Sequence, residues 1–251
     1  MILLVWDAFL IIILTNGNVI LLVWDSFLII ILTGSEDTRK IVDQLQKEGY
    51  KGISIYTRTP SEGKGLSSAV VLGIEKTKYS TVLVMDADLQ HEPESVPDVA
   101  FPVLVGDADF SVGSRNVIGG GIGGDWSVHR RILSRGATLL ALPLTPCTDP
   151  MSGFFAIDKA VFNSGKHLVN PIGYKIGLEL MVRCRIPASR QKDVPITFRD
   201  REAGESKLDM RQNIYYLQHL AILYWFAFPY LVLFMVLLGC FTLFMLYSFL
   251  F

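Results

Sequence analysis

A short apolar run that ends in acidic residues is the feature that most constrains this chain. Residues 82–92 read VLVMDADLQHE, and an uninterrupted apolar run of this length is typical of a strand buried on both faces of a parallel sheet. Asp86 and Asp88 follow two positions apart, so their carboxylates lie on one side of an extended chain, and Gln90 continues that side. The pattern predicts an α/β fold with a ligand site at the carboxyl end of this strand.

Two carboxylates and one amide oxygen on the same side suit a hard divalent cation. Oxygen ligands favour Mg2+ or Mn2+, and the phosphates of a nucleotide would complete an octahedral shell. The alternative interpretation is a surface turn with three polar residues, but the buried strand directly before them favours a site. We therefore predict that Asp86, Asp88 and Gln90 bind Mg2+ or Mn2+.

The composition excludes a global attraction for nucleic acid. The 251 residues include 23 Lys+Arg and 24 Asp+Glu, so any basic function must be local and no nucleic-acid partner is expected. The three cysteines, Cys147, Cys184 and Cys240, lack metal-binding spacing and cannot all pair, which favours a reducing compartment. The hydrophobic content of 51% is high for a soluble protein, and its excess lies at the two ends of the chain.

The amino-terminal region contains two nearly identical apolar copies. Residues 2–15 and 20–33 differ at a single position. Two copies are too few for a solenoid, so a recent duplication or a faulty gene model is the better explanation. Each copy has a run of three isoleucines that suits a buried strand, whereas Asp7 or Asp25 would interrupt a membrane span. We predict two strands here, not a signal anchor.

Helical and strand patterns alternate through the next part of the chain. The predicted elements are a helix at 36–48, a strand at 53–56, a helix at 67–76, a helix ending at 105 and a strand at 108–112. Strand, helix and strand in this order imply parallel pairing through right-handed crossovers. The EGKG loop before the second helix lacks the full phosphate-loop spacing, so we interpret it as a helix start.

A glycine tract precedes a basic helical segment. The tract, residues 119–124, cannot pack a core and predicts a linker or a mobile loop over a site. In the following segment, Arg131 and Arg135 lie one helical turn apart, with Arg130 beside them. One interpretation is an exposed basic stripe. Beside a lipid-facing site, the same stripe becomes a cradle for an anionic headgroup.

The carboxyl-terminal residues predict a membrane helix. Residues 220–251 contain no charged residue, and residues 229–251 would extend about 34 Å as a helix, enough for the hydrocarbon core. The alternative, a buried core helix, rarely runs this long. Lys207 and Arg211 precede the span, which places the preceding domain on the cytosolic side. Residues 213–225 are amphipathic and would lie against the bilayer.

Six sequence blocks in one order resemble a known enzyme family. They are DADLQHEP at 86–93, GSR at 113–115, the glycine tract with WSVHRRILSRGATLLA at 126–141, DPMSGFFA at 149–156, GYKIGLEL at 173–180 and VPITFRDREAGESKL at 194–208. Together they resemble the dolichyl-phosphate mannosyltransferases, family-2 glycosyltransferases of the GT-A fold, and six ordered blocks are more specific than any one motif. The resemblance covers about residues 36–225 of the chain.

This resemblance implies an activity and its partners. Such an enzyme transfers mannose from GDP-mannose to dolichyl phosphate, with inversion, for N-glycosylation, O-mannosylation and GPI-anchor synthesis. Its catalytic domain lies on the cytosolic face of the endoplasmic reticulum membrane. The chain resembles the type that carries its own anchor and does not require accessory membrane subunits.

The resemblance also implies a role for individual residues. The sugar nucleotide would meet Asp86, Ala87 and Asp88, with Asp88 as the catalytic residue, and the metal would be held by Asp86, Asp88 and Gln90. The residues implied to contact substrate phosphates are Arg115, Arg201 and Lys207. The residues implied to face the lipid phosphate are Arg130, Arg131 and Ser134.

The expected chemistry needs no strong general base. A phosphate acceptor with a second pKa near 6 is largely anionic at neutral pH. Accordingly, the four histidines show no arrangement with a nucleophile, and we interpret each as a surface or a satisfied histidine: His91, His129, His167 and His219. The reaction instead needs neutralisation of the departing GDP and alignment of two anions.

The nucleoside half of the site departs from the family pattern. The family opens with a strand that ends in a P-x-Y-N-E type motif, which has no counterpart here, and a second strand that ends in D-D-G-S. The second reads IIILTGSEDT, with Leu32 and Thr33 in place of the acidic pair. Two alternatives therefore stay open: a catalytically impaired paralogue or truncated product, and a dolichyl-phosphate glucosyltransferase that uses UDP-glucose.

The sequence divides into four expected parts. Residues 1–35 form an atypical duplicated apolar segment, and residues 36–208 form the GT-A catalytic domain. Residues 209–228 are an amphipathic membrane-interface segment, and residues 229–251 are a transmembrane anchor.

Overall fold

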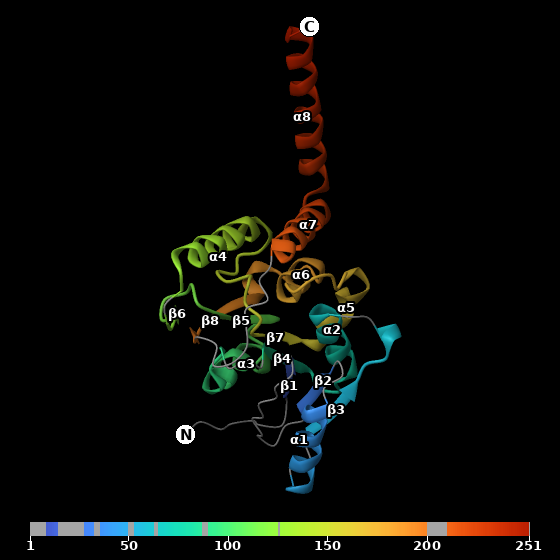
Figure 1. Cartoon of the computed structure of the whole chain (residues 1–251), viewed down its shortest axis with the longest axis vertical. Helices are drawn as coiled ribbons and strands as arrows, with labels where there is room; N and C mark the ends of the chain where they lie inside the picture. The colour runs from blue at the N-terminus through green and yellow to red at the C-terminus, as the bar shows by residue number, and fades with distance from the viewer. Residues whose placement is uncertain are drawn as a thin grey trace.

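The computed structural model describes a three-layer α/β domain from which one long helix projects (Figure 1). The described residues are 9–14, 28–32, 36–49, 53–62, 65–86, 90–124, 126–199 and 210–250. The main sheet runs in the spatial order β3 (Ile53–Thr57), β2 (Leu28–Leu32), β1 (Phe9–Leu14), β4 (Thr81–Asp86), β7 (Phe155–Asp158), β5 (Phe110–Ser114) and β8 (Gln191–Pro195). A small second sheet pairs β6 (Gly121–Ile122) with β9 (Thr197–Phe198).

The helices alternate with these strands along the chain. They are α1 (Glu36–Lys47), α2 (Leu66–Lys76), α3 (Val96–Leu104), α4 (Val128–Ala141), α5 (Lys159–Gly165), α6 (Ile176–Arg183), α7 (Met210–Ala227) and α8 (Pro229–Leu250). Short 3-10 turns lie at Pro60–Glu62, Pro93–Ser95, Leu142–Leu144, Lys166–Leu168 and Ala188–Arg190.

The order of strand addition reverses beside β1. The chain builds β1, β2 and β3 outward as parallel neighbours and then returns to place β4 on the other side of β1, also parallel. In this register Leu14 at the end of β1 lies beside Asp86 at the end of β4. Open α/β sheets bind ligands at the carboxyl ends of strands where the order reverses, so the topology places the acidic residue of β4 at such a point.

One strand breaks the expected parallel pattern. The parallel pairing expected for the strands before β7 is confirmed for β1 to β4, but β7, which was not predicted, runs antiparallel to both of its neighbours, β4 and β5. Phe155, the first residue of β7, pairs with Val84 and Val112 near the carboxyl ends of those two strands. An antiparallel strand between parallel ones therefore brings the loop that precedes it to the ligand-binding edge of the sheet.

Both copies of the amino-terminal repeat supply strands, which confirms that prediction. The isoleucine run of the first copy forms β1 and that of the second forms β2, and the two pair in parallel with Ile12 beside Ile29. The sequence suggested that the first strand of the family has no counterpart, yet β1 occupies a place beside β4. A central position selects for apolar β-branched residues, which both copies contain, whatever motif follows the strand.

Most of the other predicted elements are confirmed. The helices α1, α2, α3 and α4 and the strand β3 lie where the patterns place them, and β5 lies two residues later than predicted. The glycine tract does not form a linker. Its residues 121–122 pair with β9, and a Cβ added at Gly120 would lie 2.4 Å from the carbonyl oxygen of Ser114. This close backbone contact admits only glycine.

The central strand β4 separates two hydrophobic cores. Val82 and Val84 pack with α2 and α6 on one face of the sheet, whereas Leu83 and Met85 pack with α1 and α3 on the other. All four side chains are buried, as expected for an apolar run covered on both faces. The two cores hold the carboxyl end of β4 in a fixed position.

A third cluster joins α4, α6 and α7 at the end of the molecule from which α8 projects (Figure 1). Leu220 and Leu223 of α7 are buried against Ala141 of α4 and Leu178 of α6. Within α8, residues 229–247 have a mean hydropathy of 2.3 and none of them is buried. By length and composition this helix could cross a membrane.

Deletion of residues 229–251 tests the assignment of α8 as an anchor. We expect the shortened protein to move from the membrane fraction to the soluble fraction, because α8 holds the exposed apolar surface that a bilayer would cover. Sedimentation of membranes washed in high salt, with the full chain as control, measures the change. A shortened chain that still sediments would locate an anchor in the amino-terminal copies instead.

Candidate functional site

The candidate site lies at the carboxyl edge of the main sheet, where β4 and β5 end and the loop before β7 begins. Asp86 ends β4, Ser114 ends β5, and the loop of residues 147–154 connects to β7 between them. These segments are far apart in sequence and are brought together by the pairing of β7 with both neighbours.

The carboxylate of Asp86 packs directly against the backbone of Gly153. A Cβ added at Gly153 would lie 2.5 Å from Oδ2 of Asp86. Any side chain at position 153 would therefore displace the carboxylate. The glycine in the DPMSGFFA block makes room for the acidic residue that ends β4.

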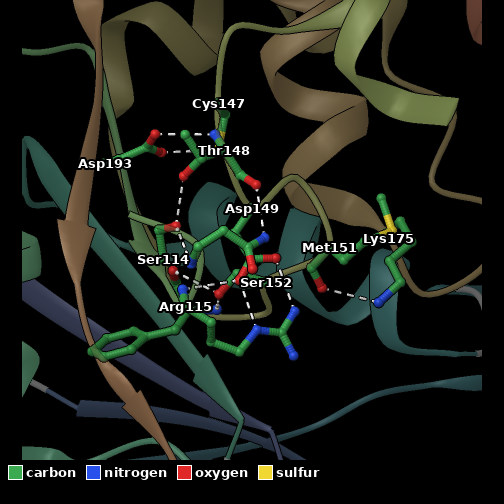
Figure 2. A network of polar contacts seen from close by, with 11 residues as sticks. Ser114, Arg115, Cys147, Thr148, Asp149, Met151, Ser152, Lys175 and Asp193 are labelled. Carbon is green, nitrogen blue, oxygen red and sulfur yellow. Dashed lines mark hydrogen bonds and ion pairs between the residues drawn. The ribbon is translucent and has the colours of Figure 1, made fainter. Parts of the chain in front are cut away.

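Arg115 and Asp149 form a buried, bidentate ion pair at the centre of the site (Figure 2). The Nε of Arg115 donates to Oδ2 of Asp149 at 2.7 Å, and its Nη2 donates to Oδ1 at 2.8 Å. The backbone N–H of Arg115 also donates to Oδ2, at 3.1 Å. The side chain of Asp149 is fully buried and that of Arg115 is 10% exposed. Such a pair is favourable only when its geometry satisfies the charges, and three hydrogen bonds to one carboxylate meet that need.

A second set of hydrogen bonds fixes the loop that carries Asp149. Asp193 of β8 accepts from the backbone N–H of Thr148 at 3.0 Å and from Sγ of Cys147 at 3.2 Å. The hydroxyl of Thr148 lies 2.7 Å from that of Ser114 (Figure 2). Burial and the nearby Asp193 carboxylate raise the pKa of Cys147, so this thiol stays protonated and serves as a hydrogen-bond donor.

Lys175 extends toward the same loop from the beginning of α6. Its Nζ donates to the carbonyl of Met151 at 3.0 Å, and Figure 2 shows it on the side of the loop toward which the Arg115 guanidinium points. Burial and the charge of Arg115 lower the pKa of Lys175, and the carboxylates of Asp86 and Asp149 partly oppose this effect. The site thus holds two cations and two carboxylates within electrostatic range of one another.

An aromatic wall borders the guanidinium of Arg115. The ring of Phe198 lies 4.9 Å from this guanidinium and the ring of Trp126 lies 5.7 Å from it. The guanidinium of Arg130 also stacks on the ring of Trp126, 3.8 Å from its centre. Stacking of this kind holds a guanidinium in one orientation, so the wall couples the start of α4 to the centre of the site.

The predicted metal ligands are only partly described. Asp86 lies at the end of β4, whereas Asp88 and Ala87 lie outside the described residues. Gln90 is buried, and its amide N–H donates to the carbonyl of Arg199 at 3.1 Å. Among the described residues, no group of three or more His, Cys, Asp or Glu side chains could hold a metal ion.

The residues predicted to contact the substrate phosphates and the lipid are also only partly described. Arg201 and Lys207 lie outside the described residues, and Arg115 lies in the centre of the site. Arg131 is exposed on α4 and Ser134 is partly buried there. The structure brings Arg130, but not Arg131, against the aromatic wall of the site.

Three candidate site residues were not predicted from the sequence. Asp149, Gly153 and Lys175 lie within the blocks that carry the resemblance but were given no role of their own. The available signal was charge, because Asp149 is the one charged residue of its block and Lys175 is one of two in its block. A charge inside an otherwise apolar or small-residue block needs a partner.

The fold and this site place the chain in a known enzyme family. The family model described as glycosyl transferase family 2 matches residues 26–165, and the chain belongs to this family. The match includes β4 with Asp86, β5 and the loop with Asp149.

Several curated relatives share a more specific name. The chain is similar to the dolichol-phosphate mannosyltransferase of Mycosarcoma maydis, with 45% identity over 195 residues, which are 78% of this chain and 64% of that protein. It is similar to the enzyme of the same name from Saccharomyces cerevisiae, with 43% identity over 74% of this chain and 70% of that protein. The enzyme of the same name from Pyrococcus furiosus is 40% identical over 62% of this chain and 44% of that protein. The chain therefore spans less than two thirds of two of these three relatives.

Solved structures show the same fold at lower identity. Glucosyl-3-phosphoglycerate synthase from Mycobacterium tuberculosis in complex with Mn2+, uridine diphosphate and phosphoglyceric acid superimposes with a TM-score of 0.61 and 19% identity, covering 88% of this chain and 78% of that one. The same enzyme with phosphoglyceric acid alone gives 0.58 and 18%, over 88% and 80%. The GT-A fold expected from the sequence is confirmed.

Replacement of Asp149 by asparagine tests the central ion pair. We expect Asp149→Asn to lower the free energy of unfolding by about 3 kcal/mol, because it leaves the buried guanidinium of Arg115 without a compensating charge. Urea or thermal unfolding in detergent measures the loss. The control is Asp107→Asn, since Asp107 is 65% exposed and lies 3.5 Å from Lys192, and it should change stability by less than about 0.5 kcal/mol. Equal effects of the two variants would contradict the role given to the Arg115–Asp149 pair.

Proposed function

We propose that this protein transfers mannose from GDP-mannose to dolichyl phosphate at a membrane surface. One observation carries the proposal above the others. The backbone carbonyl of Met151 accepts a hydrogen bond from Lys175 in the site, while the Met151 side chain lies in the cluster formed by α4, α6 and α7. The loop that carries the central ion pair is thus built into the helices next to α8, which suits a soluble donor and a lipid acceptor.

The exposed surface of those helices supports a membrane location. On α4, Val128 is 73% exposed, Ile132 is 64% exposed and Leu139 is 65% exposed. On α7, Trp225 is 55% exposed. Apolar side chains beside arginines favour an interface with anionic headgroups. In this proposal residues 36–208 form the catalytic domain on the cytosolic face of the endoplasmic reticulum, residues 209–228 lie at the interface and residues 229–251 cross the bilayer.

The residues of the site suit a direct displacement between two anions. An oxygen of the lipid phosphate attacks the anomeric carbon of mannose, and the bond from this carbon to the β-phosphate oxygen of GDP breaks, with inversion. The acceptor is already anionic at neutral pH, so no side chain has to remove a proton. The task of the protein is to align the two substrates and to offset their charge, for which Arg115, Arg201 and Lys207 are the proposed phosphate contacts.

The donor set at the end of β4 fits a divalent cation. Carboxylate oxygens of Asp86 and Asp88 and the amide oxygen of Gln90 are hard ligands of the kind that Mg2+ and Mn2+ prefer. Such a cation would offset the negative charge that develops on the departing diphosphate. The Mn2+ in the Mycobacterium tuberculosis enzyme of the same fold supports this assignment.

The nucleoside half of the site motivates a second candidate. Leu32 ends β2 at the edge of the sheet where the family has an acidic pair. Without these carboxylates the chain has fewer groups to fix the ribose and base. The missing acidic pair would be compatible with a donor that has another base, such as UDP-glucose. It would also be compatible with a protein that binds every nucleotide weakly.

A transfer assay tests the proposal. Membranes that contain the protein are supplied with dolichyl phosphate and labelled GDP-mannose, and label in the lipid extract is measured. We expect mannose transfer that Asp88→Ala abolishes, because the loss of one proposed metal ligand leaves the departing charge without compensation. Transfer from UDP-glucose alone would replace the proposed donor. No transfer, with no nucleotide binding by calorimetry, would identify a non-catalytic protein.

Arg131 tests the proposed lipid side of the site. Arg131 is exposed, and among the described residues its guanidinium makes no hydrogen bond or ion pair. It can therefore donate hydrogen bonds to a phosphate from outside the protein. We expect Arg131→Ala to raise the KM for dolichyl phosphate about tenfold, with little change in the KM for GDP-mannose. Arg131→Lys should recover only part of the loss, because an ammonium lacks the bidentate fork.

The control for this variant is Lys192→Ala, which removes an exposed cation that is paired with Asp107. It should leave both KM values unchanged. If Arg131→Ala weakens donor binding and leaves the lipid dependence unchanged, α4 belongs to the donor diphosphate and the proposed division of the site is wrong.

A further inference from the structure

Lys175 is a half-buried ammonium that no described carboxylate pairs with. Its one hydrogen bond among the described residues goes to the carbonyl of Met151, at 3.0 Å. An ammonium has three N–H donors, so two of them make no bond to this part of the protein. Burial without an anionic partner costs free energy.

Two exposed lysines, in contrast, do have carboxylate partners. The exposed Lys166 lies 3.2 Å from a carboxylate oxygen of Glu75, and the exposed Lys192 lies 3.5 Å from Asp107. Exposed ammonium groups gain little from such pairs, because water already solvates them. Lys175 is less exposed than these two lysines and gains more from an anion, yet none of the described carboxylates forms an ion pair with it.

The two nearest sources of negative charge do not satisfy Lys175. Asp149 engages Arg115 through both of its oxygens. Asp86 lies close enough to raise the pKa of Lys175, and it has an interaction of its own, whereas the described hydrogen bond of Lys175 goes to Met151. Arg115 repels the ammonium, and an anion placed between the two cations would relieve that repulsion.

The position of Lys175 is fixed by the helix that follows it. It is the residue before α6, and the next turn of that helix carries Glu179, which accepts from the backbone N–H of Asn170 at 2.7 Å and lies 2.7 Å from Nε2 of His219. His219 belongs to α7, so α6 is held against the helix that leads into α8. A side chain on such a support holds its charge in a defined place, as a binding group must.

We propose that Lys175 is a further substrate-binding residue, whose ammonium contacts a phosphate oxygen beside Arg115. The inference rests on the proposed function and refines it, since the phosphate belongs either to the donor diphosphate or to the lipid acceptor. Both sources offer the same anionic oxygen, and kinetics with the two substrates distinguishes them.

The experiment compares three variants of the full chain in membranes: Lys175→Met, Lys175→Gln and Lys175→Arg. Methionine keeps the length of the side chain without a donor, glutamine offers a neutral donor to Met151, and arginine keeps the charge. Initial rates of mannose transfer are measured with GDP-mannose and dolichyl phosphate varied in turn. Lys192→Met is the matched control, because it removes an exposed lysine away from the site.

We expect Lys175→Met and Lys175→Gln to raise one KM about tenfold while the other stays within twofold, and Lys175→Arg to recover part of the loss. A change in the KM for GDP-mannose assigns the contact to the donor, and a change in the KM for dolichyl phosphate assigns it to the acceptor. Full recovery by glutamine would overturn the proposal, because a neutral bond to Met151 would then suffice. Unchanged KM values in all three variants would overturn it as well.

Direct binding separates this inference from the proposed function. Titration calorimetry with GDP, and with detergent micelles that contain dolichyl phosphate, is carried out on the wild type and on Lys175→Met. If the wild type transfers no mannose but binds either probe, weaker binding by the variant still supports the phosphate contact. Equal affinities of the two proteins for both probes would refute it, whatever the transfer assay gives.

Discussion

The rest of the site depends on one buried ion pair, between Arg115 after β5 and Asp149 before β7. It joins two segments that lie 34 residues apart, in a place where neither charge could remain alone. The same contact sets the loop around Gly153, whose lack of a side chain leaves room for the Asp86 carboxylate. With Asp149 committed to Arg115, Lys175 is left to another anion. The charge arrangement of the whole site thus follows from this single pairing.

The antiparallel strand β7 explains why these groups meet. A parallel strand in its place would begin at the opposite edge of the sheet and would carry its preceding loop away from Asp86. Because β7 runs against β4 and β5, the loop from Cys147 to Phe154 arrives beside both strand ends. It enters the site on one side and the cluster of α4, α6 and α7 on the other through Met151. The sheet topology therefore connects the site to the helices next to α8.

The layer of α4, α6 and α7 is held by polar contacts as well as by apolar packing. Tyr216 and Tyr224 of α7 donate to backbone carbonyls of α4 at 2.6 Å and 2.9 Å. On the other side, His219 of α7 meets the buried carboxylate of Glu179 in α6. Hydrogen bonds at fixed positions define the register of a helix more narrowly than apolar contact does. The helix that leads into α8 is therefore held in a defined position against α4 and α6.

The sequence by itself determined most of the elements up to α4, the long apolar helix α8 and the family. Local periodicity identifies α1 to α4, the two amino-terminal strands and β4, because burial on one face or on two leaves a pattern in neighbouring residues. It identified Asp86 because the acid ends an apolar run. It could not give the direction of β7, the paired strand inside the glycine tract, or the partners of Asp149 and Lys175. These depend on contacts between residues that are distant in the chain, and a local pattern carries no record of which distant charge will be buried beside it.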